Sequence, residues 1–164
     1  ERDKALPVVA AGETVHAEPF DVKFLKAFQA VEAKPIFPSK PGKRWLLITL
    51  EVTNTTQQSI HRALLVKSLS LKADGLTSEF GSTTIDPALY RLPDGLSPDS
   101  FQPDLTQKIV AAWQQNDSEP LPKELTVTLS ENSYRKSSLT GEKAWFDPEE
   151  KFSATLTVEE LKQQ

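Results

Sequence analysis

Four aspartates in one irregular stretch of the chain are the residues best suited to chemistry. Asp86, Asp94, Asp99 and Asp104 lie within residues 76–106, where glycines and prolines interrupt every regular pattern. Carboxylate oxygens on irregular backbone are ligands that Ca²⁺ prefers. The spacing is not that of an EF-hand, and aspartate also favours turns before proline or glycine. Calcium binding by this loop is therefore one interpretation, and simple turn formation is the favoured one.

The two histidines, His16 and His61, are the next candidates for chemistry. Nucleophilic catalysis needs a Ser, Thr or Cys beside a base, most often a histidine. The sequence has no G-x-S-x-G motif and no cysteine. A zinc or copper site would need both histidines and a carboxylate, and no spacing in the chain supports one. We therefore expect a protein that is not an enzyme, with no catalytic residues and no cofactor, and both histidines on strand surfaces.

The adjacent aromatic residues Trp145 and Phe146 are predicted to cover one end of the domain. If exposed, this pair would form a contact surface for a protein partner or a glycan. Burial in the core is the favoured interpretation. Trp113 is also predicted to be buried, and Trp45 is predicted at a sheet edge or under a loop.

Composition limits the class of protein. The chain has 164 residues, enough for one domain with a substantial core, and 38% of them are hydrophobic. The net charge is −4 with no basic block, which argues against nucleic-acid binding. The longest apolar run, Trp45–Leu50, is too short to cross a bilayer, so we expect no membrane insertion by this fragment.

Two residue types are missing altogether. Without cysteine the chain has no disulfides and no thiolate ligands, and without methionine it lacks even a starting residue. We therefore expect a fragment or a processed form, from which an upstream signal peptide or anchor has been removed.

The stretch from residue 43 to 59 gives the clearest structural signal. Its apolar residues alternate with polar ones up to Asn54, as a half-buried β-strand requires. Further strands are predicted at 14–19, 20–28, 61–72, 108–114, 124–130 and 152–158, and a helical turn at 87–91. For 20–28, Phe20, Val22, Phe24 and Phe28 are placed on one face, with a helix over 21–32 as the alternative. Within 61–72 the apolar alternation shifts by one residue, which indicates a bulge or a crossing between sheets.

Short alternating strands without a long amphipathic helix predict an all-β fold. The expected architecture is an immunoglobulin-like antiparallel β-sandwich of about seven to nine strands. Residues 1–12 are predicted to be a linker or N-terminal arm, and residues 13–164 a single domain. The N-x-S/T triplets at Asn54 and Asn116 are expected in exposed loops.

The segment GKRWLLITLEVTNTT, beginning at Gly42, resembles the first strong strand of a bacterial extracytoplasmic immunoglobulin-like family of unknown function. Some members of that family carry the misleading name of a telomeric repeat-binding factor. The turn at 73–75 is similar to the next motif of the family. The following apolar-x-Pro-Gly turn is matched at residues 101–104, with Asp104 in place of the glycine. The resemblance covers about residues 13–130 and implies a secreted or envelope-tethered module without established catalytic residues.

The sequence thus predicts a non-catalytic extracytoplasmic binding module. Its partner is expected to be a protein or another component of the cell envelope, with Trp145 and Phe146 as candidate contact residues. The alternative is a carrier or sensor of a small ligand or of calcium, bound through the aspartate-rich loop at residues 86–104.

Overall fold

The computed structural model of the chain describes residues 6–30, 41–73, 75–77, 86–92, 95, 99–136, 141 and 143–160, with the backbone alone at 77, 135–136, 143–148 and 160. Within these residues the elements, in chain order, are β1 (Thr14–Ala17), β2 (Phe20–Ala30), β3 (Lys43–Asn54), β4 (Ile60–His61), α1 (Arg62–Ser68), β5 (Leu69–Lys72), β6 (Leu76–Thr77), β7 (Ala88–Arg91), β8 (Ser100–Phe101), β9 (Thr106–Asn116), β10 (Glu124–Lys136) and β11 (Lys143–Glu160).

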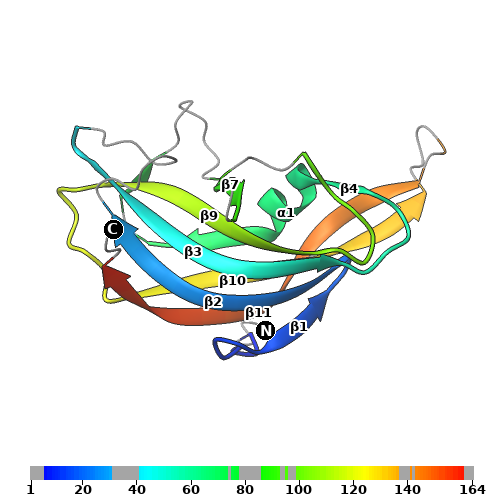
Figure 1. Ribbon diagram of the computed structural model, residues 1–164, viewed down its shortest axis with the longest axis horizontal. Coiled ribbons are helices and arrows are strands. Elements are labelled where there is room, and N and C mark those ends of the chain that lie inside the picture. The colour runs from blue at the N-terminus through cyan, green and yellow to red at the C-terminus, as the bar shows by residue number, and fades with distance from the viewer. Residues whose placement is uncertain are drawn as a thin grey trace, which may run out of the picture.

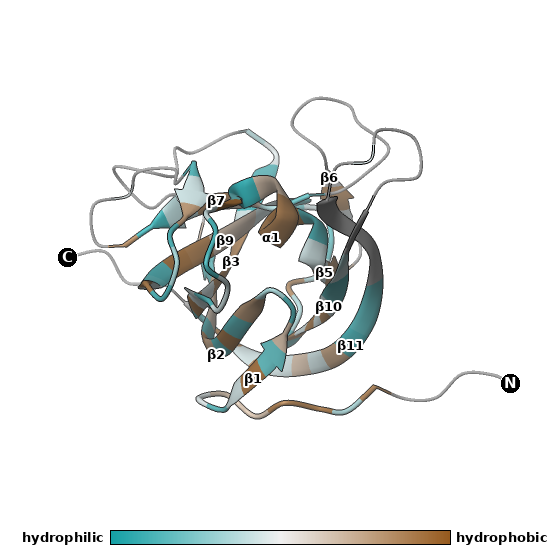
Figure 2. Ribbon diagram, turned by 90° about the vertical axis from the view of Figure 1, so that its right-hand side faces the viewer, coloured by the Kyte–Doolittle hydropathy of each residue, from teal (hydrophilic) through white to brown (hydrophobic). Residues whose placement is uncertain are grey.

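The long strands form one path that curls over a common core. Its order is β5-β10-β11-β2-β3-β9-β6, with β1 added to β2 and β7 added to β9. Strand β11 joins the two layers: most of its length pairs antiparallel with β10, and Val158–Glu160 pairs in parallel with β2. Seen end-on, β10 and β11 face β3 and β9 across the interior (Figures 1 and 2). The protein is a β-sandwich, as the alternating pattern predicts.

Strand β3 supplies the centre of the core. Leu46, Ile48, Leu50 and Val52 are all fully buried, and they belong to a single cluster with the inward residues of β2, β9, β10 and β11. The register places Leu50 beside Phe24 of β2 and Ile109 of β9. Because side chains alternate along a strand, the period-two pattern of β3 places its apolar residues on the core face. The predicted end of this strand at Asn54 is confirmed.

Strand β2 differs from the prediction in one respect. It is a strand rather than a helix, but the pairing with β3 shifts between Phe24 and Lys26. A bulge of this kind moves every later side chain to the opposite face. Ala27 is therefore buried in the main core, whereas Phe28 packs against a separate cluster on the other face. The prediction that Phe28 shares the face of Phe24 is wrong for this reason.

That separate cluster covers the outer face of β3 and β9. Its buried members are Ala30, Trp45, Leu47, Val110 and Ala112, with Phe28, Tyr90 and Leu92 packed against them. Strand β7 lies beside β9 and pairs with it along this part of the sheet. The predicted helical turn at 87–91 is therefore wrong. Trp45 is buried within this separate cluster, and Trp113 lies in the main core as predicted.

The strand predicted over residues 61–72 is confirmed at Leu69–Lys72, which form β5, but a short helix takes the place of its first part. The shift in apolar alternation there occurs at α1, which lies between β4 and β5. His61 caps the helix, since its Nδ1 accepts from the backbone N–H of Ala63 at 3.1 Å. Leu65 is fully buried in the main core. The helix contacts β5 and β10 on one side and β7 on the other, so it covers the open side of the curled sheet (Figure 2).

Residues near the N-terminus run beside β11. The N–H of Val9 donates to the carbonyl of Ser153, whose own N–H donates to Pro7. Val9 is buried in the main core, and Val8 is exposed. Among the residues described, no helix has the length and apolar character needed to cross a membrane.

Candidate functional site

The structure describes three of the four aspartates that suggested calcium binding, and each has different surroundings. Asp86 is exposed just before β7, and Asp99 forms an ion pair with Arg62 at 3.4 Å. Asp104 lies after β8, and its N–H donates to the carbonyl oxygen of Asn54 at 2.8 Å. Asp94 lies outside the described residues.

No group of three or more His, Asp or Glu residues with metal-binding geometry occurs in the described part of the chain. The calcium interpretation therefore gains no support from Asp86, Asp99 and Asp104, and it stays a prediction. Thermal unfolding with and without millimolar calcium tests it, because a cation that binds only the native state raises the melting temperature.

The aromatic pair proposed as a contact surface lies in β11. The backbone of Trp145 pairs with Tyr134 of β10, and that of Phe146 pairs with Ser133. Their side chains lie outside what the structure describes, so their role as contact residues stays a prediction. Tyr134, on the same hairpin, has an exposed side chain.

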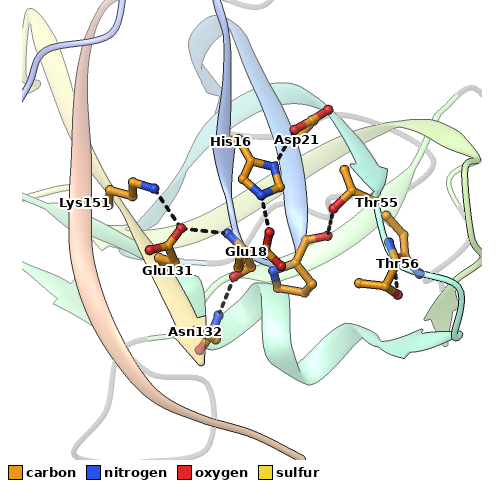
Figure 3. Close-up of polar contacts among 10 residues, drawn as sticks. His16, Glu18, Asp21, Thr55, Thr56, Glu131, Asn132 and Lys151 are labelled. Atoms are coloured by element: carbon orange, nitrogen blue, oxygen red, sulfur yellow. Dashed lines mark hydrogen bonds and ion pairs between the residues drawn. The ribbon is translucent and has the colours of Figure 1, made fainter. Parts of the chain in front are cut away.

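His16 is the centre of a polar cluster at the turn between β1 and β2 (Figure 3). Its Nδ1 lies 2.8 Å from Asp21 Oδ1, and its Nε2 forms a short contact with Glu18 Oε1. We call His16, Glu18, Asp21, Glu131 and Lys151 the turn cluster. Hydrogen bonds to Glu18 and then to Asp21 raise the pKa of His16, because both contacts favour the protonated ring.

This arrangement determines what His16 can do chemically. Each ring nitrogen already faces a carboxylate, and the two carboxylates lie on opposite sides of the ring. When the ring carries both protons, neither nitrogen can accept a proton from a substrate or bind a metal ion. His16 is therefore placed as a cation between two anions.

Backbone contacts join the same turn to the opposite layer. The N–H of Glu18 donates to Glu131 Oε2 at 3.2 Å, and the carbonyl of Glu18 accepts from the N–H of Asn132 at 2.9 Å. Lys151 Nζ lies 2.7 Å from the same oxygen of Glu131. The hydrogen bond from Lys151, partly opposed by burial, lowers the pKa of Glu131. These contacts connect β1 and β2 with β10 and β11.

The other side of the turn is fastened to the end of β3. The N–H and the hydroxyl of Thr55 both donate to the carbonyl of Pro19 at 3.0 Å. Asn54 is fully buried, and its amide donates to the carbonyls of Gln58 and Phe101. The N-x-T triplet at Asn54 therefore does not lie in an exposed loop, contrary to the sequence prediction. Its polar side chain organises the chain around β8.

A groove of about 520 Å³ lies at the opposite end of the sandwich. Its lining consists of Lys72, Ala73, Gln115, Pro120, Leu121 and Pro122. These residues come from the end of β5, the end of β9 and the segment that leads into β10. Leu121, a large apolar side chain at the side of this groove, is 44% exposed.

The sequence contains a partial signal for each of these features. His16 and Asp21 flank a short Pro-containing turn, so antiparallel pairing places them opposite each other. Glu131 and Lys151 are too far away in sequence to be assigned to that turn. For the groove, the Pro-Leu-Pro segment at 120–122 is a local signal, but nothing in the sequence indicates that Lys72 lies beside it.

Comparison with known proteins identifies the fold. No family model matches the chain, and no curated protein matches it either. The crystal structure of an uncharacterized beta-sandwich protein from Clostridium difficile 630 is similar, with a TM-score of 0.61 at 12% sequence identity. The similarity covers 96% of this chain and 98% of the other. At this identity the comparison shows a shared β-sandwich architecture over nearly the whole chain.

Proposed function

We propose that the protein is a non-catalytic binding module that holds an extended segment of a partner protein in the groove beside β5. The observation that carries this proposal is the groove itself, with an exposed leucine at its side. Its volume is within the range of sites that hold a small ligand or a few side chains. Two prolines and one leucine provide apolar contact, and Lys72 adds a single positive charge at the side.

The neighbouring strand favours an extended polypeptide as the occupant. Strand β5 ends the strand path and pairs with β10. On its other side, the N–H of Leu69 donates to the carbonyl of Val66, and within the described ranges no other segment forms a backbone hydrogen bond to residues 70–72. Unpaired N–H and C=O groups on a strand edge can pair with an added strand, and side-chain pockets next to the edge then provide specificity.

The polar residues at the other end support a binding role rather than catalysis. Both histidines have structural contacts: His61 caps α1, and His16 lies between two carboxylates. The resemblance noted above adds the finer proposal that the domain is immunoglobulin-like and acts outside the cytoplasm, secreted or tethered to the cell envelope. A fusion of alkaline phosphatase to the full-length natural protein tests this location, because that enzyme becomes active only after export.

Site-specific photocross-linking tests the groove. A benzoylphenylalanine at position 121 should give a defined cross-linked product with one protein in the organism that makes this chain. The matched control places the same residue at Leu105, another exposed leucine in a loop, which is 49% exposed. Cross-links of equal yield at both positions, or none at position 121, would contradict the proposal. In a further experiment the benzoylphenylalanine is placed at position 72. Leu121→Asp should then abolish the cross-linked product, whereas Leu105→Asp should not.

A further inference from the structure

The turn cluster contains a hydrogen-bond arrangement that requires a specific protonation state. A neutral imidazole has one N–H, so it donates through one nitrogen and accepts through the other. The two nitrogens of His16 face Glu18 and Asp21, whose ionised carboxylates only accept. Both contacts are therefore hydrogen bonds only when the ring carries two protons. Loss of one proton turns one of them into a contact between two acceptors.

Glu18 also joins the two layers of the sandwich through its backbone. Its N–H donates to Glu131, and its carbonyl accepts from Asn132, which is 3% exposed. The side chain of Glu18 is thus held by His16 while its backbone is held by β10 (Figure 3). We propose that His16 is a proton-dependent switch, which fastens the β1–β2 turn to β10 when its ring is doubly protonated and loosens the turn when the ring becomes neutral.

The charges around the ring agree with this direction. Glu18 and Asp21 face it from the turn and β2, and Glu131 of β10 faces it with Lys151 of β11 behind. Strand β3 places Thr53, an uncharged residue, beside Asp21. With His16 protonated, these five described groups carry a net charge of −1; with His16 neutral, they carry −2. Deprotonation therefore adds carboxylate repulsion to the loss of one hydrogen bond.

The expected opening is local. Strand β1 pairs only with β2 in the described structure, and such edge segments open at lower free energy than core strands. Ala17 and Phe20, on either side of the turn, remain buried in the main core. The global fold should therefore persist across the transition, while exchange of the turn amides with solvent becomes faster.

Nuclear magnetic resonance on the intact chain tests the switch in two measurements. The ring ¹⁵N shifts of His16 should show that both nitrogens stay protonated at pH values above 6.5, the ordinary pKa of histidine. The protection factor of the Glu18 amide, corrected for intrinsic exchange, should fall several-fold as the pH rises through that titration. The matched variant His16→Gln should give a protection factor with no such step, and His61→Gln should retain the step.

Two further variants separate this switch from a purely structural contact. Asp21→Asn and Glu18→Gln should each move the titration of His16 to lower pH, because each removes an anion that favours the charged ring. A His16 titration at or below the ordinary range would overturn the proposal. So would identical pH profiles of Glu18 protection in the natural chain and in His16→Gln.

Discussion

The backbone N–H of Asn132 in β10 donates to the carbonyl oxygen of Glu18 at 2.9 Å, which connects residues 114 positions apart. The pairing between β10 and β11 is irregular between Glu131 and Ser133, so this amide is directed to the β1–β2 turn. A bulge in one layer thus provides the donor that holds a turn of the other layer. The side chain of Asn132 adds a hydrogen bond to the buried hydroxyl of Ser68 at 2.9 Å.

Replacing Asn132 by alanine should lower the free energy of unfolding by about 1–3 kcal/mol. The side chain is almost fully buried, so its removal leaves Ser68 without this donor and creates a small cavity. Urea unfolding of Asn132→Ala, Ser68→Ala and the double variant measures the effect. The two single effects should sum to more than the effect of the double change, because they remove the same hydrogen bond. Strict additivity would show that the two residues are independent.

Asp104 has a φ of 60°, a backbone conformation that favours glycine. In the family that the sequence resembles, the turn matched by residues 101–104 has a glycine at this position. Because its side chain is exposed, substitutions there should act through the backbone alone. Asp104→Val should lower the free energy of unfolding by about 1–2 kcal/mol, whereas Asp104→Gly should change it by less than about 0.5 kcal/mol. Thermal unfolding of both variants checks this order, and equal melting temperatures would contradict it.

The long strands could be predicted because apolar residues recur at every second position, even where β3 and β9 carry further apolar residues on the outer face. In β3, β9 and β10, the apolar residues at every second position lie in the core, and Trp113 is buried where the pattern places it. The pattern failed where alternation is interrupted. The bulge after Phe24 moved Phe28 to the other face, and seven residues of α1 were too few to show a helical period.

The candidate sites were harder to predict because each combines distant segments. The contact between Glu18 and Glu131 depends on how two layers pack, which no local spacing encodes. The groove joins Lys72 to Leu121 through the start of β10 and the end of β5. In contrast, His16 and Asp21 are paired across a short turn, so the strand-turn-strand pattern holds a local signal for this contact, although the sequence prediction placed His16 only on a strand surface.

Two glycines allow a backbone effect to be separated from a steric one. Gly42 and Gly75 have nearly equal φ values of 74° and 73°. A Cβ at Gly42 would meet open space, whereas a Cβ at Gly75 would collide with the side chain of Glu119. Both alanine variants should lose about 1 kcal/mol of stability through backbone strain, and Gly75→Ala should lose more. Adding Glu119→Ala to Gly75→Ala should bring the loss of stability, measured by urea unfolding, back to that of Gly42→Ala. A loss that stays larger would contradict the collision.

The ion pair between Lys151 and Glu131 should stabilise the protein only above acidic pH. Because the folded-state pKa of Glu131 is lowered, the contribution is present above its ordinary value of 4.5 and is lost as the pH falls through the folded-state value. Both side chains are partly exposed, so Lys151→Met should cost at most about 1 kcal/mol at neutral pH. The similarly exposed pair Lys23–Glu51 provides the control, and Lys23→Met should cost less because its atoms are 3.7 Å apart rather than 2.7 Å. A Lys151→Met effect that persists at pH 2 would contradict the assignment.

His16 should contribute stability in the opposite pH range. Its folded-state pKa is raised, mainly by the hydrogen bond to Glu18 and then by that to Asp21. Its contribution is therefore complete below the unfolded value of about 6.5 and is lost as the pH rises through the folded-state pKa. The difference in free energy of unfolding between the natural chain and His16→Gln should be constant between about pH 5 and pH 6.5 and shrink as the pH rises through the folded-state pKa. Urea unfolding across this range measures it, and a difference that grows with pH would show that the neutral ring is the stabilising form.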